Sequence, residues 1–207
     1  DAERIEHLAE QCRGDLGAAP SLVFAFVSPD WKPHLRELGE ILQIHGHSPL
    51  VLGCSTDGLV GVGEERENTS GLTLLFLHLP NTGIEVKTLS EDETEQALPF
   101  TNTSGTSGMN GAAGGGDPTD EEDTWIVLGD PARLPAESWL RKWNAAWPDS
   151  SCYGGLASGD PEQDGFFLFR ETGLVEGAAA LVLRLSGGVR VEAVVSQGCR
   201  PIGKPYT

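Results

Sequence analysis

Positive charge is scarce in this sequence. Its 207 residues include 14 Lys and Arg against 31 Asp and Glu, which gives a formal net charge of −17 at pH 7. Such a surface repels the phosphates of nucleic acids and of anionic membranes, so neither is expected as a partner. A pocket lined by backbone N–H groups can still attract an anion, because its local field need not follow the net charge.

Long hydrophobic runs are also absent from the sequence. No apolar stretch approaches the roughly 18 to 20 residues that cross a bilayer, and no basic-then-apolar leader opens the chain. The first residue is Asp1 rather than Met, so we expect a processed chain or a piece of a longer one. We expect a cytoplasmic location, or a plastid if the source is a photosynthetic eukaryote.

Cysteine is sparse, and its spacing does not match the common metal or disulfide frameworks. The chain has four cysteines: Cys12, Cys54, Cys152 and Cys199. They form no C-x-x-C pair, and His45 and His47 lack further ligands at a useful spacing, so no metal site is predicted. Because no G-x-x-x-x-G-K-[ST] motif is present either, we expect no cofactor and no nucleotide hydrolysis.

The first hundred residues alternate between helical and extended patterns. Residues 1–13 repeat apolar positions at helical spacing, and Gly14 and Gly17 are expected to end that helix. A buried strand at 21–28, a helix at 33–46 and a buried strand at 48–54 then predict a β-α-β unit. Its two strands should be parallel, with a right-handed crossover.

Two further strands are predicted at 71–80 and 83–91. The short connection around Asn81, Thr82 and Gly83 is typical of a β-hairpin, so these strands are expected to pair with each other.

Residues 101–123 contain no Ile, Leu, Val or aromatic side chain and are expected to be a disordered insert that ends in an acidic run.

After this insert the pattern of strand and helix starts again. In the helix predicted at 136–148, three tryptophans recur every four residues and so lie on one face: Trp139, Trp143 and Trp147. This stripe predicts that the face packs on a sheet. Strands are predicted at 124–131, 151–160, 165–171, 177–186 and 188–198.

The two halves of the chain repeat the same order of elements. Ala25 and Val127 are 102 residues apart in equivalent strands, and so are Gly53 and Gly155 at the ends of the next strands. We therefore predict an α/β fold with an internally duplicated β-α-β-plus-hairpin unit and mixed sheets flanked by helices. The first half would span 1–100 and the second 124–198.

Three short motifs resemble the FIST domain family. They are the buried strand that enters GCSTDG at 53–58, the GGLASGD segment at 154–160 and the closing SQGCRPIG at 196–203. The resemblance covers most of residues 20–207 except the insert. It implies that 1–207 is a FIST N-terminal domain, and that 199–207 begins a C-terminal region.

The family resemblance implies a sensory domain that binds a small ligand, for which amino acids or related metabolites have been proposed. The C-terminal FIST region of the same chain is the implied intramolecular partner. An alternative is a module that recruits a protein partner, because the family also occurs attached to F-box proteins. Neither reading implies a catalytic residue.

Glycine-flanked loops are the predicted binding site. Consecutive N–H groups and hydroxyls in such loops can hold a carboxylate or phosphate at the carboxyl end of a buried strand, although each loop alone could be a plain turn. Arg200 would clamp the anion. The predicted ligand-binding residues are Gly53, Cys54, Ser55, Thr56, Gly58, Gly154, Gly155, Ser158, Gly198 and Arg200.

A Cys54-dependent enzyme is the remaining alternative. A thiolate nucleophile needs a neighbouring His, cation or helix N-terminus to lower its pKa. In the sequence His45 and His47 lie a strand length away from Cys54, and the adjacent Asp57 would raise the thiol pKa. We therefore expect Cys54 to be a pocket wall or a core residue, not a nucleophile.

Overall fold

The computed structural model describes residues 2–61, 63–96, 123–148 and 150–194. Its helices are α1 (Ala2–Leu16), the 3-10 helix η1 (Pro29–His34), α2 (Leu35–Ile44), α3 (Glu91–Gln96), α4 (Ala136–Ala146) and the 3-10 helix η2 (Pro161–Gln163). Its strands are β1 (Leu22–Val27), β2 (Val51–Ser55), β3 (Gly58–Val60), β4 (Glu65–Glu67), β5 (Leu72–Leu77), β6 (Thr82–Ser90), β7 (Thr124–Gly129), β8 (Ser151–Leu156), β9 (Leu168–Arg170), β10 (Gly173–Leu174) and β11 (Ala178–Gly187).

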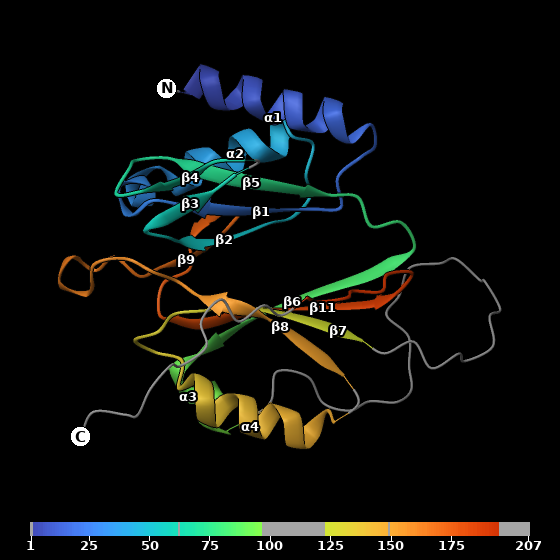
Figure 1. Cartoon of the computed structure of the whole chain (residues 1–207), viewed down its shortest axis with the longest axis vertical. Coiled ribbons are helices and arrows are strands. Elements are labelled where there is room, and N and C mark those ends of the chain that lie inside the picture. The colour runs from blue at the N-terminus through green and yellow to red at the C-terminus, as the bar shows by residue number, and fades with distance from the viewer. Residues whose placement is uncertain (1, 62, 97–122, 149, 195–207) are drawn as a thin grey trace, which may run out of the picture.

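The elements form four layers (Figure 1). Helices α1 and α2 cover a sheet of order β10-β9-β2-β1-β5, which faces a second sheet of order β6-β11-β7-β8. Helix α4 covers the outer face of the second sheet, and β3 and β4 form a separate hairpin. The predicted α/β class with mixed sheets flanked by helices is confirmed.

Both predicted β-α-β units are present. Strands β1 and β2 are parallel and joined through α2, and β7 and β8 are parallel and joined through α4. In each sheet the first strand of the unit also pairs with an antiparallel strand, β5 for β1 and β11 for β7. The two sheets therefore share a pattern of strand directions, while the duplication itself stays a prediction.

The predicted hairpin between β5 and β6 is wrong. Strand β5 pairs with β1 in the first sheet, whereas β6 pairs with β11 along nearly its whole length in the second sheet. The turn at Asn81, whose φ is 57°, lies where the chain passes from one sheet to the other. Ile84 and Val86 pack into the layer between the sheets, so β6 buries its apolar residues on β11 instead of on β5.

The second half makes the reciprocal exchange. Strand β9 pairs with β2 in the first sheet and β10 pairs with β9, although both follow β8 in the chain. Each half of the chain thus supplies strands to the sheet built by the other half. The four layers interlock, and the halves 1–100 and 124–198 are not separable as structural units.

Two other local predictions differ from the structure. The strand predicted at 188–198 is absent from its described part, 188–194, where Val194 is 96% exposed. Helix α1 continues through Gly14 and ends before Gly17, which adopts a positive φ of 66°. A single glycine costs a helix only about 1 kcal/mol, less than the packing of Ile5 and Ala9 contributes.

Three apolar clusters separate the layers. The first lies between α1–α2 and the first sheet and includes Leu38, Leu42 and Val23. The second lies between the two sheets, and the third between the second sheet and α4. Trp139 and Trp143 are 1% and 2% exposed in the third cluster, against Trp125 of β7. The predicted sheet-packing role of the tryptophan stripe is confirmed for these two residues.

The layer between the sheets is built from alternate residues of β1, β2, β7 and β11. Phe24, Leu52 and Cys54 face it from the first sheet, and Leu128, Leu181 and Leu183 face it from the second.

Among the described residues, none of the helices has the length and apolar character needed to cross a membrane.

Gly53 of β2 tolerates no side chain. A Cβ at this position would lie 2.2 Å from the Cζ of Phe169 and 2.3 Å from the carbonyl oxygen of Ala25. The strand therefore needs glycine here, because β2 is held between β1 and β9.

The Gly53→Ala variant is expected to lose about 3 kcal/mol of unfolding free energy, because overpacking a fixed backbone contact forces neighbours apart. Gly58→Ala adds the same methyl group five residues later, at the start of β3, where nothing lies within 4 Å of an added Cβ. Its stability should stay within about 0.5 kcal/mol of the unmodified chain. Urea denaturation measures both, and equal midpoints would contradict the close approach of β9 to β2.

Candidate functional site

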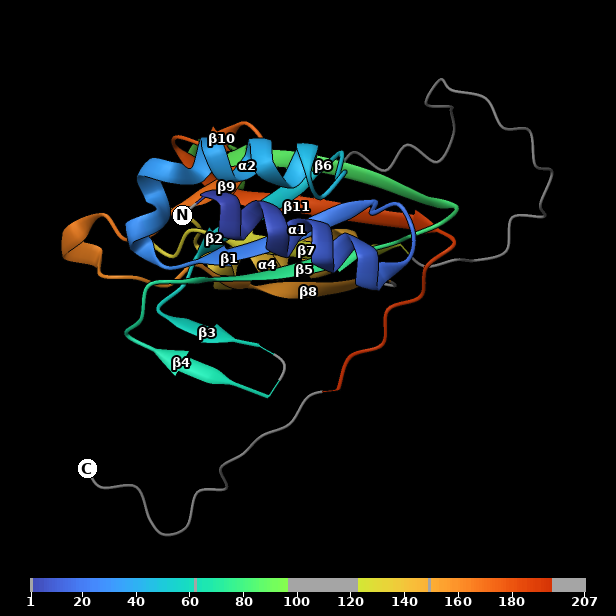
Figure 2. The ribbon, with the colours of Figure 1, turned by 90° about the horizontal axis from the view of Figure 1, so that it is seen from above.

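One pocket brings together five of the ten predicted binding residues. It has a volume of about 430 Å³ and lies between the two sheets, on the side where the edge strands β5 and β8 lie (Figure 2). Residues from the first half and the second half both line it: Phe24, Phe26, Cys54, Ser55, Thr56, Leu75, Ile126, Leu128, Gly154, Gly155 and Leu156.

Most of the pocket wall is apolar, and the sequence analysis did not assign those residues to a site. Phe24 and Phe26 come from β1, and Ile126 and Leu128 come from β7. Each pair is separated by one residue, so both side chains of a pair face the same side of their sheet. In the sequence this alternation is indistinguishable from ordinary core packing, and only the stacking of the sheets shows that it lines a cavity.

On β8, the missing side chain of Gly155 leaves the space open. Gly154 and Gly155 line the pocket at the middle of this strand, and both are exposed. Gly154 has a φ of 147°, and a Cβ there would lie 1.9 Å from the carbonyl oxygen of Val127. At Gly155 nothing lies within 4 Å of an added Cβ. The first glycine is required by the backbone, whereas the second only leaves room.

The strand register corrects the predicted correspondence between the halves. Ala25 is paired with Gly53, and Val127 is paired with Gly154. If Ala25 is aligned with Val127, the counterpart of Gly53 is therefore Gly154 and not Gly155. Cys54 then corresponds to Gly155, since these residues pair with the next positions of β1 and β7.

The two predicted loops are bonded directly to each other. The backbone N–H of Ser158 donates to the carbonyl oxygen of Ser55 at 3.1 Å. The N–H of Asp57 in turn donates to the Ser158 hydroxyl at 3.0 Å. Ser158 is thus a link between the halves, and its hydroxyl is engaged by the protein.

The backbone amides at the centre of the predicted anion nest are already engaged by the protein. The N–H of Ser55 donates to the carbonyl oxygen of Phe167, and the N–H of Thr56 donates to that of Val27. The hydroxyl of Thr56 donates to the carbonyl oxygen of Gly58 at 2.6 Å. These groups are already satisfied, so the loop cannot cradle a carboxylate or phosphate in the way its sequence suggests.

Two of the remaining predicted residues, Gly53 and Gly58, are described by the structure and do not line the pocket between the sheets. Gly53 is fully enclosed in β2, and Gly58 begins β3 in open surroundings. Gly198 and Arg200 lie outside the residues that the structure describes, as does the predicted insert up to residue 122. The clamp proposed for Arg200 stays a prediction.

Cys54 is poorly suited to act as a nucleophile. Its side chain is 5% exposed, and burial raises the pKa of the thiol to about 12. His45 is engaged elsewhere, with its Nδ1 3.0 Å from Glu10 on α1. Among the described residues no group of three or more His, Cys, Asp or Glu is arranged to hold a metal ion. The thiol is a wall of the pocket, as the sequence analysis expected.

Alkylation of the folded chain by iodoacetamide at pH 7.5 should leave Cys54 almost unmodified. A pKa raised from 9.0 to about 12 lowers the thiolate fraction about a thousandfold, and burial blocks access as well. In urea the same residue should react freely. Peptide mass mapping measures both rates, with Cys12 as the more exposed internal reference. Modification of folded Cys54 faster than Cys12 would instead indicate an activated thiol.

Comparison with known proteins places the chain in a family. The FIST N domain family matches residues 21–207. The chain is 28% identical over 207 residues to an uncharacterized protein of Mycobacterium tuberculosis (strain ATCC 25618 / H37Rv), covering 99% of this chain and 49% of that protein. It is 29% identical over 202 residues to an uncharacterized protein of Mycobacterium bovis. That match covers 96% of this chain and 47% of the relative. The chain spans about half the length of these curated relatives and belongs to the FIST family, whose domains are generally sensory domains of signalling proteins.

Proposed function

We propose that this chain is the ligand-binding part of a sensory protein and that a small metabolite binds in the pocket between the sheets. The observation that carries the proposal is the shared pocket of about 430 Å³, which is walled by both halves of the chain. Its volume is within the range of small-molecule sites, which are mostly apolar with a few polar groups. Cys54, Ser55, Thr56, Gly154 and Gly155 are the predicted residues that line it.

The walls favour an amino acid with an apolar side chain over a simple anion. No Lys or Arg is among the described residues that line the pocket. Within the described chain, β8 pairs only with β7, so its other edge presents unpaired backbone groups beside Gly154 and Gly155. A strand edge offers both N–H donors and C=O acceptors, which suit the ammonium and carboxylate of an amino acid. The apolar side chain would pack on Phe24, Phe26 and Ile126.

The open side of the pocket suggests how binding would be transmitted. The β3–β4 hairpin and the chain that follows β11 both extend on the side of β5 and β8 (Figure 2). Residues 188–193 and Tyr153 of β8 line a separate hollow there. We propose that a C-terminal FIST region docks on this side and covers the bound ligand. The length of the relatives supports such a region, because the chain covers only 47–49% of them.

Gly155→Leu tests the pocket directly. The new side chain enters free space, since nothing lies within 4 Å of its Cβ, and it should fill the pocket without straining β8. The unmodified chain is screened by thermal shift against amino acids and small carboxylates. A ligand present at 100 times its Kd should stabilise the chain by about 2.7 kcal/mol and raise its melting temperature by a few degrees. The same ligand should give no shift with Gly155→Leu.

The matched control is Gly14→Leu, which adds an identical side chain on α1 where nothing lies within 4 Å. It should keep the full ligand shift. A shift that persists in Gly155→Leu would place the ligand elsewhere. The screen is best run with the C-terminal region of the protein present, because a site closed by two regions binds weakly when one is missing.

Recruitment of a protein partner is the second candidate function. Leu75 on β5 and Leu156 on β8 are each 49% exposed and flank the same pocket. Exposed apolar side chains around a hollow are also typical of protein interaction sites. If no compound shifts the melting temperature, but Leu75→Asp and Leu156→Asp abolish binding of a partner protein, this second function is favoured.

A further inference from the structure

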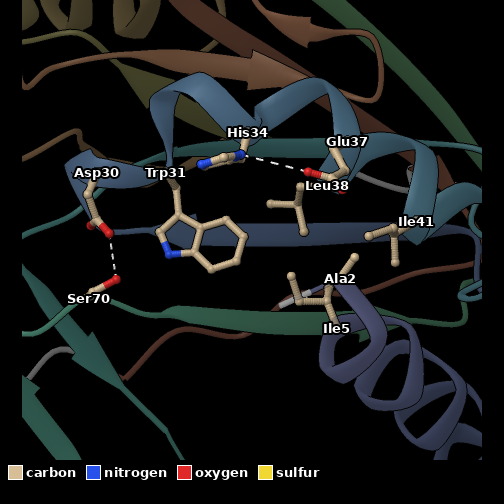
Figure 3. Close-up of a pocket in the computed structure, with 9 residues that line it drawn as sticks. All are labelled: Ala2, Ile5, Asp30, Trp31, His34, Glu37, Leu38, Ile41 and Ser70. Carbon is tan, nitrogen blue, oxygen red and sulfur yellow. Dashed lines mark hydrogen bonds and ion pairs between the residues drawn. The ribbon is translucent and has the colours of Figure 1, made fainter.

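A second cavity lies on the far side of the first sheet, away from the pocket between the sheets. It has a volume of about 270 Å³ and opens where the first turn of α1 meets η1 and the start of α2 (Figure 3). This volume is slightly below the range of drug-sized sites, so a ligand here would have few atoms. The sequence analysis assigned no role to this part of the chain.

Two carboxylates from different elements border the cavity. Asp30 belongs to η1 and Glu37 to α2. Asp30 accepts hydrogen bonds from the hydroxyls of Ser28 and Ser70, both at 2.5 Å. Burial works against its ionisation, but these hydrogen bonds outweigh burial and lower the pKa of the Asp30 carboxyl. The side chain is thus held in one place as a charged carboxylate.

The remaining wall is aromatic and aliphatic. The indole of Trp31 extends into the cavity between Asp30 and Leu38, and Ile5 and Ile41 line the side toward α1 and α2 (Figure 3). An indole ring is the aromatic surface that attracts cations most strongly, because its face carries negative electrostatic potential. Carbon-bearing cations gain further from the aliphatic wall, which a bare ion cannot use.

The cavity carries little positive charge of its own. Among the described residues that line it there is no Lys or Arg, and His34 is the sole basic side chain. Its Nδ1 lies 3.7 Å from a carboxylate oxygen of Glu37, and both side chains are more than half exposed. A metal ion is a poor fit, because the described lining offers just two carboxylates, Asp30 and Glu37, on a wall with much apolar surface.

We propose that this cavity binds a small alkylated ammonium ion, with the cation against Trp31 between Asp30 and Glu37 and the alkyl groups against Ile5 and Leu38. The site is separate from the pocket between the sheets and does not depend on the function proposed for that pocket. Aromatic faces are the surfaces by which proteins recognise quaternary ammonium groups, and the two carboxylates here would add attraction for the positive charge.

Titration of the whole chain with choline chloride by isothermal calorimetry tests the proposal. Sodium chloride at the same ionic strength controls for screening, and 3,3-dimethylbutan-1-ol controls for shape, because it replaces the ammonium nitrogen by carbon. Choline should bind saturably and at least about tenfold more tightly than the neutral alcohol. Equal binding of the two would show an apolar cleft without selectivity for a cation and would overturn the proposal.

Variants locate the binding. Trp31→Leu should weaken choline binding about threefold to thirtyfold, and Glu37→Gln about twofold to fivefold. Among the described residues Glu37 is ion-paired with His34 alone, and its side chain is 59% exposed, so its variant should fold normally even if Trp31→Leu does not. The matched control is Glu40→Gln, which removes a carboxylate from the same helix outside the cavity and should leave binding unchanged. Unchanged affinity in Glu37→Gln and a folded Trp31→Leu would refute the site.

Discussion

The fold depends on the apolar layer in which the two sheets face each other. Phe24 and Leu52 on one side and Leu181 and Leu183 on the other are at most 5% exposed. A fully buried side chain of this size contributes about 1.5–3 kcal/mol, so the layer outweighs any surface contact. Because β6 joins the second sheet and β9 joins the first, each half completes the sheet of the other. Neither half can bury its strands alone, which makes folding of the two halves interdependent.

The candidate site is a local interruption of that layer. Protein interiors are close-packed, so a cavity between two sheets requires that side-chain volume be missing. Here β8 places Gly154 and Gly155 in the cavity wall, with unfilled space at Gly155, and β2 adds the small side chain of Cys54. The backbone demands the first of these glycines, since its φ is 147° and Val127 leaves no space for a Cβ. The packing that holds the sheets together and the space for a ligand therefore arise from one arrangement of strands.

Local pattern in the sequence predicted the elements well but not how distant segments meet. The β-α-β units follow from apolar runs and helical spacing, which depend on neighbouring residues alone. The turn at Asn81 has the residues typical of a β-hairpin. However, β6 pairs with β11, which lies about a hundred residues later in the chain and belongs to the second sheet. Within the predicted loop at 53–58, Cys54, Ser55 and Thr56 lie in the pocket wall, but amides of this loop are satisfied by Phe167 and Ser158. A pattern within six residues cannot reveal acceptors so far along the chain.

If a ligand binds between the sheets as proposed, the same long-range bonds would couple its binding to the arrangement of the sheets. A ligand changes a protein only by binding two of its arrangements with different affinity. Ser158 joins the loop after β8 to Ser55 and Asp57 after β2, so both sheets meet at one end of the pocket. Leu75 and Leu156 lie on the edge strands β5 and β8, each of which is paired on one side only within the described chain. A ligand between Phe26 and Ile126 would touch both sheets and set their separation about the fixed end. The exposed edges of β5 and β8 are where such a change in separation would be largest, and they lie beside the surface proposed for the C-terminal region.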